Sequence, residues 1–433
     1  MTAAASFPTD VPSQRRAIRI GFCLLWLVLV VGVTAMIAVG GRPDPVGLGQ
    51  TLDGAWLFRA GDDPGWADPK ANEQGWDRIS LVSRPENQDG DVGIPGWLDG
   101  WRARGHPALE GFGWYRRHVT LPAGGDLVLV GPPSVDDGYE AYWNGHPIGG
   151  VGRLSGVPKV IGTRPRLMAL PIAPGAHAGV LAIRAYMQTG VARDRQSGGL
   201  RTAPVLAPRA EGEALYRAEW RRTIAGYVVD AAEPLAMLVL AVVAVLEATR
   251  LARPDFSRWT ALALVFSACT RLGNAVSAWT DSLGLPTFLW VSGVVLTPLA
   301  KLGWTLAWNR WANGKEQRLV TVTAIVAWAA MTAGALLESG LLDGIGRALI
   351  ALTLLAIAVR IARAGEDRWI ALGAMALVAV GLFAGDLSAL GVPGIWFPFH
   401  IGVSRSQYAY ALALPLLAFA LTASGGGSGR PRR

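Results

Sequence analysis

Residues that build metal sites and disulfide frameworks are scarce in this chain of 433 residues. It has two cysteines, Cys23 and Cys269, and both fall inside long apolar runs. The stretch 50–208 has none, so it has neither a disulfide framework nor a cysteine metal site. The five histidines are scattered, and the HExxH, GxSxG and P-loop patterns are missing. We therefore expect a protein that is not an enzyme, with no metal, no cofactor and no catalytic residue.

The net charge of +8 does not indicate a nucleic-acid partner. Many arginines stand in short loops beside apolar runs, where membrane topology explains them. No soluble helix is expected to carry a basic stripe. The main expected partner is therefore the lipid bilayer, and nucleic acid is excluded.

The dominant feature of the chain is the stretch 224–421, a series of apolar runs broken by short loops. Most runs approach the roughly 20 residues that cross a hydrocarbon core. Backbone groups in lipid must be satisfied within the segment, so the sequence predicts an all-α bundle of seven membrane-spanning helices. The expected spans are 224–248, 259–279, 288–308, 319–337, 342–360, 370–390 and 408–421.

A further apolar run, 20–39, follows Arg15, Arg16 and Arg19. Positive charge before an apolar run predicts that residues 1–16 stay in the cytoplasm and that the chain after 41 is exported. The run is long for a signal-peptide core, which favours a retained anchor at 17–40. The small-x-small pattern Ala38-Val39-Gly40 instead fits a cleaved signal peptide, so both interpretations stand.

Between the N-terminal run and the bundle, residues 50–208 have a different character. Short β-type runs alternate with Gly, Pro and Asp turns, which is typical of a β-sandwich or jelly roll. Asn144-Gly145 predicts a tight hairpin, and Pro147 marks the returning strand as an edge. The expected strands are 55–60, 78–82, 113–121, 126–130, 138–143, 166–170 and 180–187.

Five short segments of this stretch resemble the N-terminal sugar-binding domain of family 2 glycoside hydrolases, a galactose-binding-like jelly roll. They are GWYRRHVTLP at 113–122, LVLVG at 127–131, YWNG at 142–145, GG at 149–150 and LAIR at 181–184.

With the apolar spans added, residues 50–421 are similar to bacterial seven-transmembrane receptors that join an extracellular jelly-roll sensor to diverse intracellular signalling modules. The resemblance implies a carbohydrate-like ligand and a signalling role. The hydrolase catalytic barrel has no counterpart here, so hydrolysis is not implied. The tail 422–433 is too short for an effector module, so a separate signalling or cell-envelope partner protein is expected.

The loop charges predict the topology. Loops 281–287 and 338–344 have acidic residues and no basic ones, whereas the alternate loops are rich in arginine. We expect a multi-pass protein of the bacterial cytoplasmic (inner) membrane, with a periplasmic or extracellular β-domain and a cytoplasmic C-terminus. Three arginines, Arg217, Arg221 and Arg222, run against this pattern. They lie in 209–223, which is interpreted as a helix that couples the β-domain to the first span.

Ionisable residues inside spans are costly and face the bundle interior. Asp230 and Glu233 are three residues apart, so both carboxylates lie on one helix face, and Arg271 and Asn274 repeat that spacing. One hypothesis is an outward-facing polar cavity beneath the β-domain, and the other is a set of interhelical ion pairs. The candidate cavity residues are Asp230, Glu233, Arg271, Asn274, Arg347 and Asp386.

In the β-domain, aromatic rings and carboxylates near Gly-rich loops suit a sugar, which offers apolar C–H faces and hydroxyl donors. The plainer interpretation makes most of the tryptophans core residues and Asp136 an ordinary turn residue. The candidate ligand residues are Trp97, Trp101, Trp114, Asp136 and Asp137.

Three functions remain open at this point. The favoured one is a membrane sensor whose bundle relays ligand binding to a separate partner. The alternative is a membrane-embedded enzyme or transporter that acts on a glycan, lipid or ion through an outward-facing charged cavity. The third is a non-catalytic accessory subunit.

Overall fold

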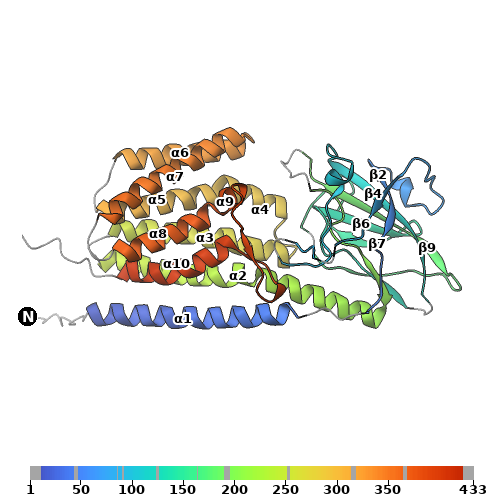
Figure 1. Ribbon diagram of the computed structural model, residues 1–433, viewed down its shortest axis with the longest axis horizontal. Helices are drawn as coiled ribbons and strands as arrows, with labels where there is room; N and C mark the ends of the chain where they lie inside the picture. Colours follow the sequence, from blue (N-terminus) through green and yellow to red (C-terminus); the bar gives the residue numbers. More distant parts are fainter. Residues whose placement is uncertain are drawn as a thin grey trace, which may run out of the picture.

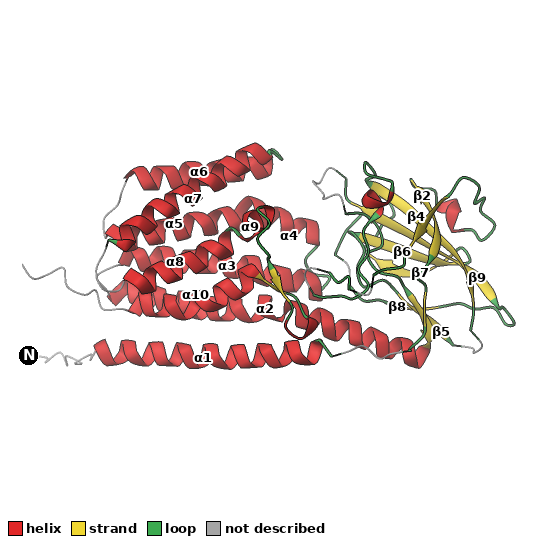
Figure 2. Cartoon of the chain, viewed as in Figure 1, coloured by secondary structure: helices red, strands yellow, loops and turns green. Residues whose placement is uncertain are grey.

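The computed structural model describes residues 11–42, 47–84, 86–89, 92–122, 126–162, 164–189, 196–250, 254–313, 318–363 and 368–422. The first ten residues of the expected cytoplasmic N-terminus and residues 423–433 of the expected tail lie outside these ranges. The molecule is elongated, with a helical bundle at one end and a β-sandwich at the other (Figure 1). Figure 2 shows that most strands lie in the β-sandwich and most helices in the bundle, while a small hairpin lies among the helices and helix α2 (Arg209–Arg250) extends to the β-sandwich.

The β-sandwich consists of two antiparallel sheets. The six-stranded sheet has the order β3-β2-β4-β9-β6-β7, and the four-stranded sheet has the order β1-β10-β5-β8. The strands are β1 (Gln50–Thr51), β2 (Ala55–Ala60), β3 (Asp77–Ser80), β4 (Gly111–Thr120), β5 (Leu127–Val130), β6 (Gly138–Trp143), β7 (His146–Val151), β8 (Leu167–Ala169), β9 (Ala178–Met187) and β10 (Val205–Pro208).

Every second residue along a strand points inward, and these residues form the core between the two sheets. Tyr115, Ile183 and Ala141 of three neighbouring strands point inward with Trp101 from a loop helix. Strand β5 is buried at all four positions, because its outer face is covered as well. Gly212 lies in helix α2, which follows β10, and an added Cβ on this glycine would come within 2.2 Å of Val128 Cγ2.

Seven helical segments form a closed ring in the C-terminal half, in the order α2, α3, α5, α6, α7, α8 and α10. The helices are α2 (Arg209–Arg250), α3 (Pro254–Trp279), α4 (Leu285–Val291), α5 (Thr297–Asn313), α6 (Arg318–Leu336), α7 (Gly340–Ala362), α8 (Arg368–Leu382), α9 (Ala384–Ala389) and α10 (Arg405–Thr422). The N-terminal helix α1 (Val11–Gly40) lies outside the ring against α2 and α10. A small hairpin of β11 (Ile395–Trp396) and β12 (Val403–Ser404) precedes α10.

Among the described residues, six helices are long and apolar enough to cross a membrane, namely α1, α2, α3, the α4–α5 segment, α6 and α7. Helix α8 is a shorter apolar helix, and the expected sixth span, 370–390, is broken at Phe383 between α8 and α9. A π-helical turn at Ser292–Leu296 interrupts the expected third span. The count of seven crossings therefore stays a prediction.

The expected coupling helix 209–223 is not a separate element. It is the first part of α2, which continues without interruption from the end of strand β10 into the bundle. Many side chains on the outside of the bundle are large, apolar and exposed, among them Leu352, Leu355 and Val242. Such a surface suits hydrocarbon and not water.

Candidate functional site

The first part of the candidate site is a buried charge cluster between α2 and α3. Arg271 Nη1 donates to Asp230 Oδ1 at 2.8 Å, and Arg271 Nε lies 3.0 Å from Glu233 Oε2. All three side chains are buried. The spacing of three along α2 brings both carboxylates to the helix face that meets α3. Two acids therefore share one guanidinium, and the ring of Tyr410 covers it with its centroid 5.1 Å from Cζ.

Arg347 and Asp386, which were expected in the same polar cavity, form a second and separate group. Arg347 Nη1 lies 2.8 Å from Asp386 Oδ1, and its Nε lies 3.1 Å from Asp343. These side chains are about one third exposed, so the group is less enclosed than the cluster around Arg271. The structure therefore divides the six expected cavity residues into two ion-paired groups, with Asn274 beside the first.

A cavity of about 150 Å³ adjoins the Arg271 cluster inside the ring of helices. Arg271 and Asn274 of α3 line it, together with Thr297 of α5, Ser406 and Tyr410 of α10. These residues lie toward the ends of their helices that face the β-sandwich. The ion-pair and cavity hypotheses are thus compatible, because the same guanidinium binds two carboxylates and contributes to a polar wall.

The second part of the candidate site lies in the loops at the bundle-facing end of the β-sandwich. Asp136 Oδ2 accepts a hydrogen bond from Gly198 N and lies 3.7 Å from Arg201 Nη1. The Arg201 guanidinium stacks over the half-buried Trp97 ring, with Cζ 4.7 Å from the centroid. Asp137 adopts a positive φ of 71° and accepts from Gln188 N at 2.7 Å. Both acids therefore order loops, as expected of turn residues.

Trp101 and Trp114 do not join this cluster. Both are fully buried, and each indole N–H is already bonded, to Leu109 O for Trp101 and to Asp62 Oδ1 for Trp114. The expectation that these two rings offer an exposed face to a ligand is corrected by this burial. Of the three expected tryptophans, only Trp97 combines partial exposure with a polar neighbourhood.

Trp114 belongs instead to an aromatic and charged layer on the outer face of the six-stranded sheet. It stacks on Tyr142 at 5.5 Å, beside Arg184, which bonds Asp62 and Glu140. Burial acts to lower the pKa of Arg184, but these carboxylate bonds outweigh burial and raise it. Burial and the bond to Glu140 raise the pKa of Tyr142 to about 12. The layer satisfies its own charges and acts as a second small core.

No protein-family model and no curated protein matches the chain. Among solved structures, it is similar to a β-glucuronidase from Bacteroides uniformis, with 20% identity over 36% of this chain and 17% of that chain and a TM-score of 0.27. It is also similar to a glycosyl hydrolase family 2 (GH2) member from Bacteroides cellulosilyticus, with 21% identity over 36% and 20% of the two chains and a TM-score of 0.26. A β-glucuronidase from Faecalibacterium prausnitzii matches at 17% identity over 39% and 33%, also with a TM-score of 0.26.

The chain thus spans 17% of the length of the first of these enzymes. Their activity and substrates are not transferred to this chain. Among the described residues, no group of three or more His, Cys, Asp and Glu side chains could hold a metal ion.

A contact that the sequence analysis missed joins the two ends of the molecule. Arg164 belongs to the loop after β7, and its Nη1 lies 2.6 Å from Oδ1 of Asp281, in the loop after α3. It also donates to the carbonyl oxygens of Ser277 and Ile161, at 3.0 and 2.9 Å. Burial lowers the pKa of Arg164, and Asp281 opposes that shift, while a guanidinium stays charged at neutral pH. No pattern in the sequence marks this arginine, because it stands in a loop among ordinary turn residues.

Two further contacts complete this junction. Val92 packs on α2 where an added Cβ on Gly226 would come within 2.1 Å of Val92 Cγ1. An added Cβ on Gly93 would meet His400 O, in the segment before α10, at the same distance. The β-sandwich therefore touches α2, the end of α3 and the approach to α10.

Proposed function

We propose that this protein is a membrane receptor in which an exported β-sandwich binds a carbohydrate-like ligand or a partner and the helical bundle relays that event. The observation that carries the proposal is the Arg164 contact. A side chain of the β-sandwich, only 3% exposed, binds the end of α3, and α3 also carries Arg271 in the buried charge cluster.

The relay has a short physical route. Ser277 and Arg271 are six residues apart on one helix, which corresponds to about 9 Å along its axis. A helix moves as a rigid unit over that length, so a shift of the Arg164 loop displaces Arg271 against Asp230 and Glu233. Buried ion pairs of this kind suit a two-arrangement switch, because an intermediate position leaves a charge uncompensated.

The ligand side of the proposal uses the bundle-facing loops. Trp97 presents a half-buried ring, and Asp136 and Arg201 lie beside it. The same loop end leads to Arg164, since β7 finishes there and the chain continues into the 152–166 loop. The sequence resemblance to a sugar-binding jelly roll favours a carbohydrate-like ligand.

The loop charges support an inner-membrane protein with the β-sandwich outside and the C-terminus in the cytoplasm. In this proposal α1 is a retained anchor, the chain performs no catalytic step, and a separate signalling or envelope protein reads the bundle.

Hydrogen exchange on the full chain in lipid nanodiscs tests the proposal. Neutral and acidic cell-wall oligosaccharides are added in turn, and exchange is followed in 92–104, 196–201 and 271–281. We expect at least one oligosaccharide to protect the loops and to change exchange in 271–281. The variant R164M should keep the loop protection and lose the response in α3.

The matched control is R166M, because Arg166 lies 3.9 Å from the same Asp281 but is about one third exposed. Its response should be that of the wild type. An α3 response that survives in R164M would contradict the route, and a panel without any loop protection would contradict the carbohydrate-like ligand.

The second candidate function, a transporter or membrane enzyme, is favoured by the polar cavity beside Arg271. It differs from the receptor in one measurable consequence. Filling the cavity with T297W should abolish activity of a transporter or enzyme, whereas oligosaccharide binding to the β-sandwich should persist.

A further inference from the structure

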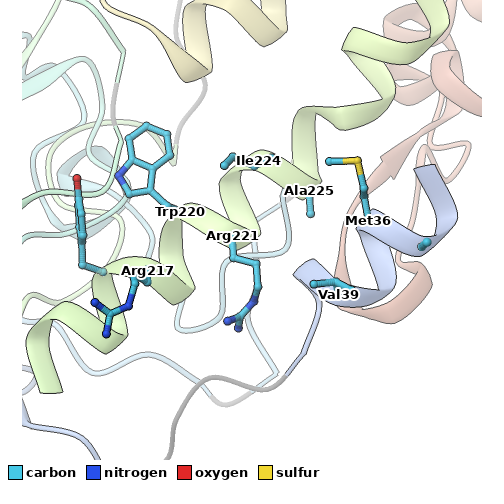
Figure 3. A pocket seen from close by; sticks show the side chains of 9 residues that line it. Met36, Val39, Arg217, Trp220, Arg221, Ile224 and Ala225 are labelled. Atoms are coloured by element: carbon cyan, nitrogen blue, oxygen red, sulfur yellow. The ribbon is translucent and has the colours of Figure 1, made fainter. Parts of the chain in front are cut away.

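Two cavities of the helical half differ in character. The groove between the end of α1 and α2, of about 530 Å³, is lined largely by apolar side chains such as Met36, Val39 and Ile224 (Figure 3). Helix α1 lies outside the ring of helices, where an apolar surface faces lipid. The cavity of about 150 Å³ inside the ring is polar instead, and Thr297 in its wall is the first of a row of polar side chains along α5.

The row consists of Thr297, Lys301, Thr305 and Asn309, spaced four residues apart. Residues four apart are neighbours on a helix surface, so each member lies next to the following one. Thr297 is half-buried, and the other three are at most 3% exposed. The row covers about 18 Å along the helix axis, which is more than half of a hydrocarbon core of about 30 Å. Its last member lies about one turn before α5 ends at Asn313.

Lys301 is the charged member of the row, and it forms no ion pair with a carboxylate of the described residues. Its Nζ lies 4.7 Å from the centroid of the Phe383 ring, so the side chain points across the ring of helices toward the break between α8 and α9. The group of Asp343, Arg347 and Asp386 interacts with it electrostatically, and Asp386 is 35% exposed. An acid that water reaches therefore lies near a buried amine.

Asn309 belongs to the cytoplasmic half of the row. Its side chain is fully buried, yet neither Nδ2 nor Oδ1 has a hydrogen-bond partner among the described residues, and the same holds for the adjacent Trp308 Nε1. Bound water is a common partner of such buried groups. Thr305, one turn earlier, donates to Lys301 O at 2.8 Å, and its oxygen can still accept. Thr305 and Asn309 therefore provide consecutive sites for hydrogen-bonded water.

We propose that the polar row of α5 is a proton path between the Asp386 group and the cytoplasmic end of the bundle, with Lys301 as its carrier. A proton passes from the Asp386 carboxyl group through bound water to the neutral Lys301 amine, which leaves a carboxylate and an ammonium. The ammonium then releases the proton to the water held by Thr305 and Asn309, and Lys301 becomes an amine again. Only O–H and N–H bonds form and break, and a pH difference across the membrane drives the transfer.

The charges along the row select a proton over other ions. A metal cation is repelled by the Lys301 ammonium in a low-dielectric interior. An anion is attracted to Lys301, but the next two members of the row are neutral. Arg271 at the cavity is already bound by two carboxylates, and Arg405 of α10 bonds two backbone carbonyl oxygens in and after α9. Ionisable side chains inside membrane helices commonly serve as proton relays.

Proton flux into liposomes tests the proposal. The full chain is reconstituted with the pH-sensitive dye pyranine trapped inside, and the outside is acidified while valinomycin and potassium clamp the membrane potential. We expect faster acidification than in protein-free liposomes. K301M removes the carrier and should slow the protein-dependent flux at least about tenfold, where each factor of ten corresponds to about 1.4 kcal/mol of barrier. K301H, which restores a titratable nitrogen, should recover part of the flux.

Two further variants test the cytoplasmic half of the row. N309L replaces the amide by an apolar group of the same branched shape, and T305V removes the hydroxyl group. Both should slow the flux. The matched control is T323V, because Thr323 of α6 also donates to the carbonyl oxygen four residues earlier, at 2.9 Å, but lies on another helix. Its flux should equal that of the wild type, and thermal unfolding in detergent checks that every variant folds.

Four results would overturn the proposal. They are acidification no faster than in protein-free liposomes, an unchanged flux in folded K301M, an equal loss in T305V and T323V, and a flux that disappears when gluconate replaces chloride. The last result would describe an anion path. None of these results bears on ligand binding by the β-sandwich, so the proton path can fail while the receptor proposal stands.

Discussion

Arg164 Nη1 and Asp281 Oδ1 lie 2.6 Å apart, with the arginine buried and the aspartate 63% exposed. The pair joins the β-sandwich to the loop after α3, and the arginine also bonds the Ser277 carbonyl oxygen. The exposed partner contributes little by itself, whereas the buried arginine donates to the carbonyl oxygens of Ser277 and Ile161. The two partners should therefore respond differently to substitution.

The first prediction concerns this asymmetry. R164M removes the donor to two carbonyl oxygens and should weaken the junction by about 1–3 kcal/mol. D281N removes only an exposed acceptor and should cost less than about 1 kcal/mol. Hydrogen exchange in 152–166 measures the opening of the junction, and equal exchange in the two variants would contradict the assigned roles.

The second prediction concerns the buried cluster around Arg271. R271M leaves Asp230 and Glu233 buried without a cation and should destabilise the bundle by about 3–5 kcal/mol. The triple variant R271M/D230N/E233Q removes all three charges and should recover much of that loss. N274A is the control, because Asn274 lines the cavity without belonging to the charge cluster. Thermal unfolding in detergent compares them, and an undisturbed R271M would show that the pairing is not structural.

The third prediction separates two tryptophans that look alike in the sequence. W101A empties a fully buried site and should cost about 3–5 kcal/mol of stability. W97A removes a half-buried ring stacked on Arg201 and should cost about 1 kcal/mol while abolishing oligosaccharide protection of the loops. Unfolding and binding are measured on both variants. Undiminished binding in W97A would remove Trp97 from the ligand site.

The fourth prediction concerns the pH dependence of the stability that an ion pair at the start of α2 contributes. Arg209 bonds Asp126 at 2.6 Å, and this bond holds the pKa of Asp126 below its ordinary value. A carboxylate with a lowered folded-state pKa stabilises the fold above its unfolded pKa, about 3.9, and that stabilisation disappears as the pH falls through the folded pKa. D126N should therefore be less stable than the wild type at pH 7, and the difference should close as the pH falls through the lowered pKa of Asp126 in the folded state. A difference independent of pH would point to a cause other than this ion pair.

The fifth prediction concerns the contact of α1 with α2. The Gly40 position has no room for a side chain because Ala225 lies against it. G40L should push the helices apart and reduce disulfide cross-linking of the engineered pair M36C/I224C. G32L is the control, since nothing lies within 4 Å of an added Cβ at Gly32. Equal cross-linking in G40L and G32L would contradict close packing of α1.

Much of the fold could be predicted from local patterns. Strands β2 and β6 begin and end where the alternation predicts, and β7, which contains Pro147, is an edge strand in the structure. Strand β10 was missed because it is short, ends in Pro208 and runs directly into a polar helix. The break after α8 was missed because the apolar run continues across it.

The candidate site was less predictable. The spacing of Asp230 and Glu233 indicates a shared helix face, and Arg271 is the buried cation that such a face requires. The separation of Arg347 and Asp386 from that cluster depends on helix packing, which periodicity does not encode. Arg164 finds Ser277 and Asp281 only after folding, and nothing in its local sequence distinguishes it from a solvated loop arginine.

Because α2 is one uninterrupted helix, an insertion in it rotates all the residues that follow about the helix axis. The helix is held at its start by strand β10 and near its middle by the buried carboxylates of Asp230 and Glu233. One residue inserted between them would turn everything beyond it by about 100°, swinging both acids away from α3. Seven inserted residues complete nearly two turns, so they restore the orientation of both acids while lengthening the helix by about 10 Å. For an insertion in this helix, the rotation that it causes should therefore matter more than the number of residues inserted.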